Sequence, residues 1–174
     1  MGLGARRIDF AFACMPKSGK TPKKNFLKSK AKGKKAFHGK RVVIVDDHPL
    51  IRRGLERMIH TADGFIVCGE AGNAADAMSL IKKERPDLAI IDVGLPDKDG
   101  IELTRRLMTE FPQLAILILS MHEEPIYALR ALKAGARGYM VKHDAVEKIH
   151  VALNDVMEGR RYLSPAMAAQ MGKR

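Results

Sequence analysis

The stretch VVIVDD, residues 42–47, decides the fold class of this 174-residue chain. Four consecutive β-branched apolar residues predict a strand that is buried on both of its faces, and the two carboxylates that follow predict a polar loop at its end. Strands buried on both faces belong to parallel sheets that are covered by helices on each side. The chain after residue 47 must therefore supply crossover helices and further strands.

Apolar strands and amphipathic helices alternate as far as residue 159. The predicted strands are 42–45, 65–68, 88–91, 114–119 and 138–141. The segments between and after them carry apolar residues at helical spacing: Ile51, Leu55, Met58 and Ile59; Ala77, Leu80 and Ile81; Ile101, Leu103, Leu107 and Met108; Ile126, Leu129 and Leu132; Val146, Ile149, Leu153, Val156 and Met157. This pattern predicts an α/β fold, a doubly wound five-stranded parallel sheet with right-handed crossovers.

Residues at the predicted helix ends agree with this reading. Asn73 and Asp144 stand where N-caps are expected, and Gly135 and Gly159 stand just beyond the ends of two helices.

Polar side chains follow four of the predicted strands, at the edge where ligands gather in open parallel sheets. Asp46 and Asp47 follow the first strand, Asp92 the third, Ser120 the fourth and Lys142 the fifth. Three carboxylates this close repel one another unless a cation neutralises them, and such hard oxygen ligands suit Mg²⁺. The pattern predicts a magnesium site that also engages a phosphate, with the hydroxyl and the ammonium contacting phosphoryl oxygens.

Asp92 is the favoured nucleophile of this set. No His base stands beside Ser120 in the sequence, whereas a carboxylate can accept a phosphoryl group directly. Each residue alone also has an ordinary interpretation: Asp46 and Asp47 as solvated turn residues, and Lys142 as a surface lysine. Their shared position at strand ends favours the site.

These segments together resemble the receiver domain of two-component response regulators. The matching pieces are 42–47 (VVIVDD), 90–100 (IIDVGLPDKDG), 119–120 (LS) and 135–142 (GARGYMVK), and the resemblance covers residues 41–159. The segments 47–55 and 135–144 are most similar to the NarL/FixJ subfamily. The resemblance implies a flavodoxin-like (βα)5 fold with strand order 2-1-3-4-5.

The resemblance also implies a role for each strand-end residue. Asp92 would be the phospho-acceptor, and Mg²⁺ would be held by Asp46, Asp47, Asp92 and the backbone carbonyl of Gly94. Ser120 and Lys142 would bind the phosphoryl group. Ser120 and Tyr139 would form the switch, in which the tyrosine turns inward when the hydroxyl moves to the phosphate; Tyr139 can equally be a core aromatic.

The function implied is that of a cytoplasmic switch rather than a turnover enzyme. It would accept a phosphoryl group from a sensor histidine kinase, catalyse its own phosphorylation and dephosphorylation, form a homodimer on phosphorylation, and control transcription. DNA binding would need a C-terminal helix-turn-helix of the LuxR type, which the sequence does not contain. Residues 160–174 would begin the linker to that output domain.

The net charge of +11 comes from the N-terminal segment and not from the predicted α/β domain. Residues 1–41 hold thirteen Lys and Arg and one acid, a charge of +12, while the remaining 133 residues carry −1. The composition of residues 1–40 predicts a disordered basic leader. Such a leader supports an alternative function, binding to nucleic acid or to an anionic surface, although no membrane segment is predicted.

Two further alternatives have little support. A phosphatase with an aspartyl intermediate would show Asp-x-Asp after the first strand, but His48 follows Asp47. Residues 6–14 mimic a secretory signal, but Asp9 interrupts a very short apolar run.

Two cysteines, Cys14 and Cys68, form no disulfide framework and fit a reducing, cytoplasmic setting.

Overall fold

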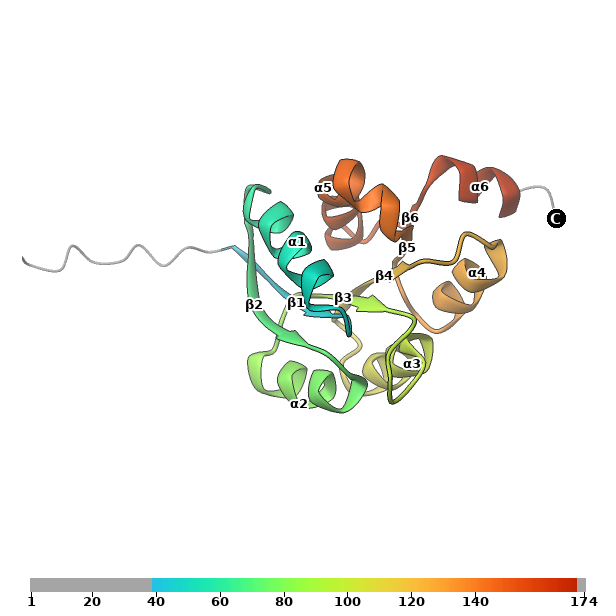
Figure 1. Cartoon of the computed structure of the whole chain (residues 1–174). Helices are drawn as coiled ribbons and strands as arrows, with labels where there is room; N and C mark the ends of the chain where they lie inside the picture. The colour runs from blue at the N-terminus through green and yellow to red at the C-terminus, as the bar shows by residue number, and fades with distance from the viewer. Residues whose placement is uncertain (1–38, 172–174) are drawn as a thin grey trace, which may run out of the picture. The chain divides into compact units, whose positions relative to one another are not determined.

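The computed structural model describes residues 39–171, so the predicted basic leader lies outside the described residues apart from its last two positions. Figure 1 shows a parallel sheet with helices on both faces. The strands are β1 (Lys40–Val45), β2 (Phe65–Ala71), β3 (Leu88–Asp92), β4 (Ala115–Ser120), β5 (Gly138–Val141) and β6 (Tyr162–Leu163). The helices are α1 (Pro49–His60), α2 (Ala74–Glu84), α3 (Gly100–Glu110), α4 (Pro125–Lys133), the 3-10 turn η1 (Lys142–Asp144), α5 (Ala145–Met157) and α6 (Pro165–Met171).

The strand order is β2-β1-β3-β4-β5-β6, and all neighbouring strands are parallel. The predicted order 2-1-3-4-5 is confirmed. The structure adds a sixth strand from the segment predicted to begin a linker: β6 pairs Tyr162 with Gly138 and Leu163 with Tyr139. Two residues are too few to show an alternating or continuous apolar pattern, so no periodicity predicts this strand.

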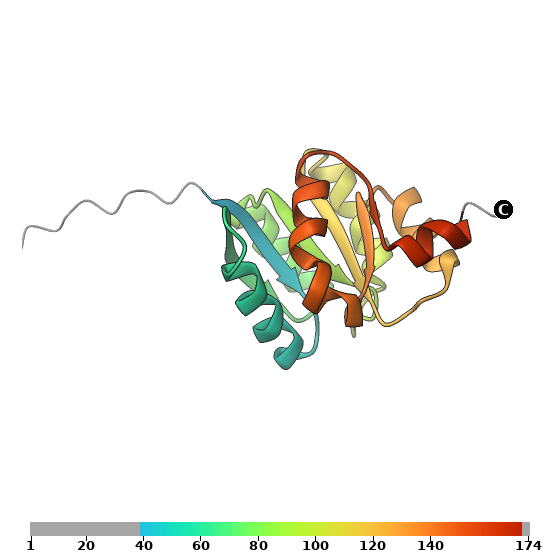
Figure 2. The same ribbon diagram turned by 90° about the horizontal axis from the view of Figure 1, so that it is seen from above.

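The continuous apolar runs of the inner strands fill two cores, one on each face of the sheet. On β1, Val43 and Val45 belong to the core that α2, α3 and α4 cover, whereas Val42 and Ile44 belong to the core that α1 and α5 cover. Figures 1 and 2 show α1 and α5 on one face and α2 to α4 on the other. Successive strand residues point to opposite faces, so burial on both faces requires an apolar residue at every position.

The helix faces agree with the sequence in part. Leu55, Ile59, Ala77 and Ile81 are buried as predicted. The predicted inward positions of three others are wrong: the side chains are exposed at Ile51, Ile126 and Val146. In α4, the buried residues are Ala128 and Ala131, because a helix can lie closer to the sheet when small side chains face it. A prediction based on the larger apolar residues selects the wrong face there.

The predicted helix ends are largely confirmed. The Asn73 side chain accepts a hydrogen bond from the Asp76 backbone N–H at 2.8 Å, and Gly135 and Gly159 have φ values of 106° and 79°. Asp144 lies at the N-cap position of α5 but makes no cap hydrogen bond, because η1 places it in a helical conformation. Its carboxylate instead pairs with Lys148 at 2.9 Å.

Gly100 brings α3 against the end of β3. Its N–H donates to the Val93 carbonyl at 2.9 Å, and a Cβ on this residue would overlap the carbonyl oxygen of Asp92. The first turn of α3 can approach Asp92 this closely only because residue 100 has no side chain.

We expect Gly100→Ala to lower the free energy of unfolding by about 2–3 kcal/mol, because the new methyl group forces the backbone apart in a packed region. Gly54→Ala on α1 is the matched control, since a Cβ there meets no atom within 4 Å. The free energy of unfolding of this variant should rise by about 0.5–1 kcal/mol, because Ala has the higher helix propensity. Urea unfolding measures both. Equal stability of the Gly100→Ala variant and the wild type would contradict the close approach.

Candidate functional site

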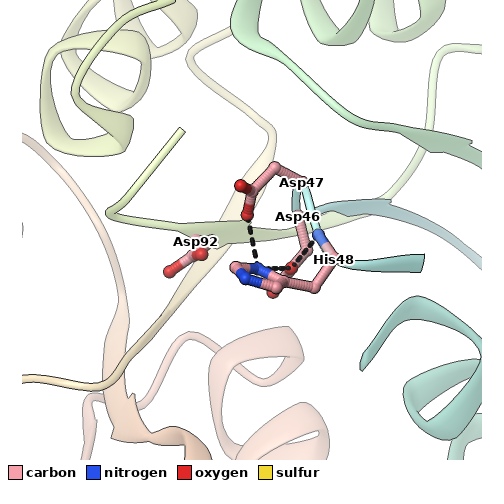
Figure 3. A group of neighbouring side chains, drawn as sticks. All are labelled: Asp46, Asp47, His48 and Asp92. Atoms are coloured by element: carbon pink, nitrogen blue, oxygen red, sulfur yellow. Dashed lines mark hydrogen bonds and ion pairs between the residues drawn. The ribbon is translucent and has the colours of Figure 1, made fainter. Parts of the chain in front are cut away.

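The predicted strand-end residues lie at one edge of the sheet. Asp46 comes directly after β1, Asp92 is the last residue of β3, and Lys142 comes directly after β5. These strands run parallel with β4 between β3 and β5, so their carboxyl ends meet. Figure 3 shows Asp46, Asp47 and Asp92 converging on this edge together with His48.

The ammonium group of Lys142 joins two of the carboxylates. Its Nζ lies 2.7 Å from Oδ2 of Asp46 and 2.7 Å from Oδ2 of Asp92. The side chains are 8%, 2% and 7% exposed, respectively. Burial lowers the pKa of Lys142, but its close contacts with the carboxylates of Asp46 and Asp92 outweigh burial and raise it above its ordinary value. Lys142 therefore stays charged at neutral pH.

Asp47 and His48 complete an acidic cluster beside this ion pair. His48 Nδ1 lies 2.6 Å from Oδ1 of Asp47, and the His48 backbone N–H donates to Oδ1 of Asp46 at 2.8 Å. One ligand atom from each of Asp46, Asp47, His48 and Asp92 lies within 4.8 Å of the others. His48 was not predicted as a member of this cluster, although its position next to the two carboxylates in the sequence is a usable signal.

The cluster has the chemistry of a metal site. Oδ2 of Asp46 and Oδ1 of Asp47 are buried and accept no hydrogen bond from any residue between 39 and 171; their close contacts are with Lys142 Nζ and His48 Nδ1, respectively. Closely spaced carboxylates with free lone pairs are the ligands that a hard divalent cation prefers. The three aspartates can therefore hold a metal ion.

Arg52 is a second residue that the sequence did not reveal. From α1, its Nη1 donates to the Asp46 carbonyl at 2.7 Å, and its Nε pairs with Glu70 at 2.9 Å. It fixes the backbone that carries the first carboxylate. Its place on the surface of an amphipathic helix gives no signal for this contact.

Ser120 and Tyr139 lie next to this cluster and are linked through one residue. Ser120 is fully buried, and its Oγ accepts a hydrogen bond from the His122 N–H at 3.0 Å. The Tyr139 hydroxyl donates to the His122 carbonyl at 2.7 Å. The ring is only 1% exposed, and burial raises the pKa of Tyr139 to about 12.

The loop after β3 brings Gly94 beside Asp92. Gly94 is exposed, and a Cβ built on it would lie 3.9 Å from Oδ2 of Asp92. The side chains of His122 and His143 are exposed, and His122 stacks on Tyr127.

A doubly wound parallel sheet with an acidic cluster and a buried lysine at its carboxyl edge defines the class of receiver domains. The family described as response regulator receiver domain matches residues 42–154, and the chain belongs to it.

Named relatives agree with this assignment. The chain is 36% identical over 131 residues to response regulator GacA of Pseudomonas aeruginosa, an alignment that covers 75% of this chain and 61% of GacA. It is 42% identical over 134 residues to the DNA-binding transcriptional activator DevR/DosR of Mycobacterium tuberculosis, which covers 76% of this chain and 62% of that protein. The chain thus spans about three fifths of the length of these curated relatives.

A solved structure gives the same result. The crystal structure of a LuxR-family two-component response regulator from Aurantimonas sp. SI85-9A1 matches with a TM-score of 0.73 and 37% identity, over 78% of this chain and 96% of that one.

Among residues 39–171, no helix has the length and apolarity needed to cross a membrane.

The raised pKa of Tyr139 predicts how stability changes at high pH. A group whose pKa is raised on folding stabilises the protein fully below its unfolded value, ordinarily 10.0, and this stabilisation is lost as the pH rises towards about 12. Urea unfolding between pH 9 and 12 should show a shallower loss of stability for Tyr139→Phe than for the wild type. Tyr127→Phe, which alters a half-buried ring on α4, is the control; identical slopes for Tyr139→Phe and the wild type would contradict the burial of this hydroxyl.

Proposed function

We propose that this chain accepts a phosphoryl group on Asp92, in a Mg²⁺-dependent reaction, from the phosphohistidine of a sensor histidine kinase. The observation that carries the proposal is the Lys142 ammonium, which lies 2.7 Å from both Asp46 and Asp92. A buried cation beside the acceptor can neutralise the phosphoryl charge that arrives there. Family membership supports the same reaction.

The transfer is a substitution at phosphorus. An oxygen of Asp92 forms the new O–P bond while the P–N bond of the donor breaks, and the released imidazole nitrogen takes up its proton from solvent. Asp46, Asp47, Asp92 and the Gly94 carbonyl would hold Mg²⁺, and the bound ion would neutralise charge on the carboxylate and the phosphoryl oxygens. Positioning and charge account for the chemistry, so no additional general base is required.

Lys142 and Ser120 receive the phosphoryl oxygens. Lys142 exchanges part of its contact with Asp46 for a phosphoryl oxygen, and the Ser120 hydroxyl donates to another. The Ser120 oxygen at present accepts from the His122 N–H, and the His122 carbonyl accepts from Tyr139. Movement of Ser120 therefore disturbs the contact that holds the Tyr139 hydroxyl, and the face formed by α4, β5 and α5 shifts between two packings.

We propose that the output is the control of transcription. The support is the printed functions of relatives, including a DNA-binding transcriptional activator. A C-terminal helix-turn-helix would bind DNA, and phosphorylation would promote a homodimer. We propose a cytoplasmic phospho-switch rather than a turnover enzyme. The alternative function through the basic leader is not favoured, because the family match begins at residue 42.

Incubation with Mg²⁺ and acetyl phosphate should add one phosphoryl group to the wild type, and intact-mass spectrometry would detect it. Asp92→Asn should show no addition, because the amide oxygen is a far weaker nucleophile than the carboxylate. Asp63→Asn, which alters an exposed turn aspartate, is the matched control and should label like the wild type. Equal labelling of Asp92→Asn and the wild type would refute the proposal.

A further inference from the structure

The loop between β3 and α3, residues 93–99, is tied to a helix that is distant in the sequence. Oδ1 of Asp97 accepts a hydrogen bond from the Ala74 N–H at 2.8 Å, and Oδ2 accepts one from the Ala75 N–H at 3.0 Å. Both donors belong to the first turn of α2. The first N–H groups of a helix have no partner within the helix, and a carboxylate is favoured there by the helix dipole.

Two residues therefore share the cap of α2. Asn73 provides the local part: its side chain accepts from Asp76, and its carbonyl accepts from Ala77. Asp97 provides the distant part: it accepts from the N–H groups of Ala74 and Ala75, which lie 23 and 22 positions away in the sequence. The hydrogen bond from Ala74 is the largest cause of a lowered pKa of Asp97, so the carboxylate is ionised at neutral pH and retains both acceptors.

Other side chains of the loop connect to α3 or α4 rather than to α2. Lys98 pairs with Glu102 at 3.1 Å, and Asp99 accepts from the Ile101 N–H at 2.7 Å. A groove of about 300 Å³ is lined by residues of α2, of the loop and of α3, among them Ala74, Asp97 and Leu103. Within residues 39–171, Asp97 is the loop residue whose side chain hydrogen-bonds to α2.

The same short loop carries the backbone next to the acceptor. The Val93 carbonyl accepts from both Leu95 and Gly100, which fixes the base of the loop beside Asp92. Gly94 lies between this base and Asp97, only three residues before the anchor. An anchored tip and a fixed base together restrict where the Gly94 carbonyl can lie.

We propose that Asp97 is a positioning residue for the acceptor site: by capping α2, it holds the β3–α3 loop so that the Gly94 carbonyl stays in place to bind Mg²⁺ beside Asp92. This inference rests on the proposed function. Asp97 acts through Gly94 and touches neither the phosphoryl group nor the metal. Its loss weakens the binding of Mg²⁺ and leaves the transfer step intact once Mg²⁺ saturates the site.

Isothermal titration with Mg²⁺ on the full chain tests this role, with acetyl phosphate labelling rates measured across Mg²⁺ concentrations. Asp97→Ala should raise the Mg²⁺ dissociation constant roughly tenfold, the low end of the effect of orienting partners on metal ligands. Its labelling rate at saturating Mg²⁺ should stay within about twofold of the wild type. Asp97→Asn keeps one acceptor oxygen, so its Mg²⁺ dissociation constant should lie between those of the wild type and Asp97→Ala.

Asn73→Ala is the matched control, because it removes the local cap of the same helix without touching the loop. It should lower the urea midpoint as Asp97→Ala does, yet bind Mg²⁺ like the wild type. An unchanged dissociation constant for Asp97→Ala, or an equal rise for Asn73→Ala, would overturn the positioning role while leaving Mg²⁺ binding by the wild type intact. Absence of Mg²⁺ binding by the wild type would overturn the proposed function and this inference with it.

Discussion

The ion pair of Lys142 with Asp46 and Asp92 is the interaction on which the rest of the site depends. Two buried carboxylates at adjacent strand ends repel each other, and the desolvation of each is costly unless a cation is present. Lys142 supplies that cation from a third strand. The pairing of β1 with β3, of β3 with β4 and of β4 with β5 must all be in register for the three side chains to meet.

The fold contains two routes by which an event at Asp92 can reach other surfaces. One passes from Ser120 through the backbone of His122 to the buried Tyr139 on β5. The other passes along the β3–α3 loop, where Asp97 contacts α2 and Asp99 contacts Arg130 of α4 at 3.1 Å. The first begins at Ser120, whose neighbour Leu119 pairs with Asp92, and the second begins in the loop that follows Asp92. Both rest on hydrogen bonds or ion pairs that a change in charge at Asp92, the proposed acceptor, can alter.

Much of this architecture could be predicted from the sequence, because strong local patterns specify it. Buried parallel strands need apolar residues at every position, as in 42–45 and 88–91, and the polar residue that ends each strand marks the edge where a ligand binds. Asp46, Asp92 and Lys142 were found in this way. The strand order came from family resemblance, since periodicity does not encode which strands are neighbours.

Other features were missed because their signal lies in tertiary contacts. The inward face of α4 depends on how closely the helix approaches the sheet, so Ala128 and Ala131 are buried where Ile126 was expected. The two-residue strand β6 shows no period. Arg52 and Asp97 gain their roles from backbone groups more than five and more than twenty positions away, and no spacing rule connects such partners.

Asp92 is the proposed acceptor, and Lys142 is the cation that would receive the phosphoryl oxygens. A crystal structure with Mg²⁺ and beryllium fluoride, which mimics a phosphoryl group on a carboxylate, tests this most directly. We expect beryllium bonded to an oxygen of Asp92, Mg²⁺ on Asp46 or Asp47 and the Gly94 carbonyl, and fluorine atoms contacting Lys142 and Ser120. An adduct on another carboxylate, or an adduct on Asp92 that Lys142 does not contact, would contradict it.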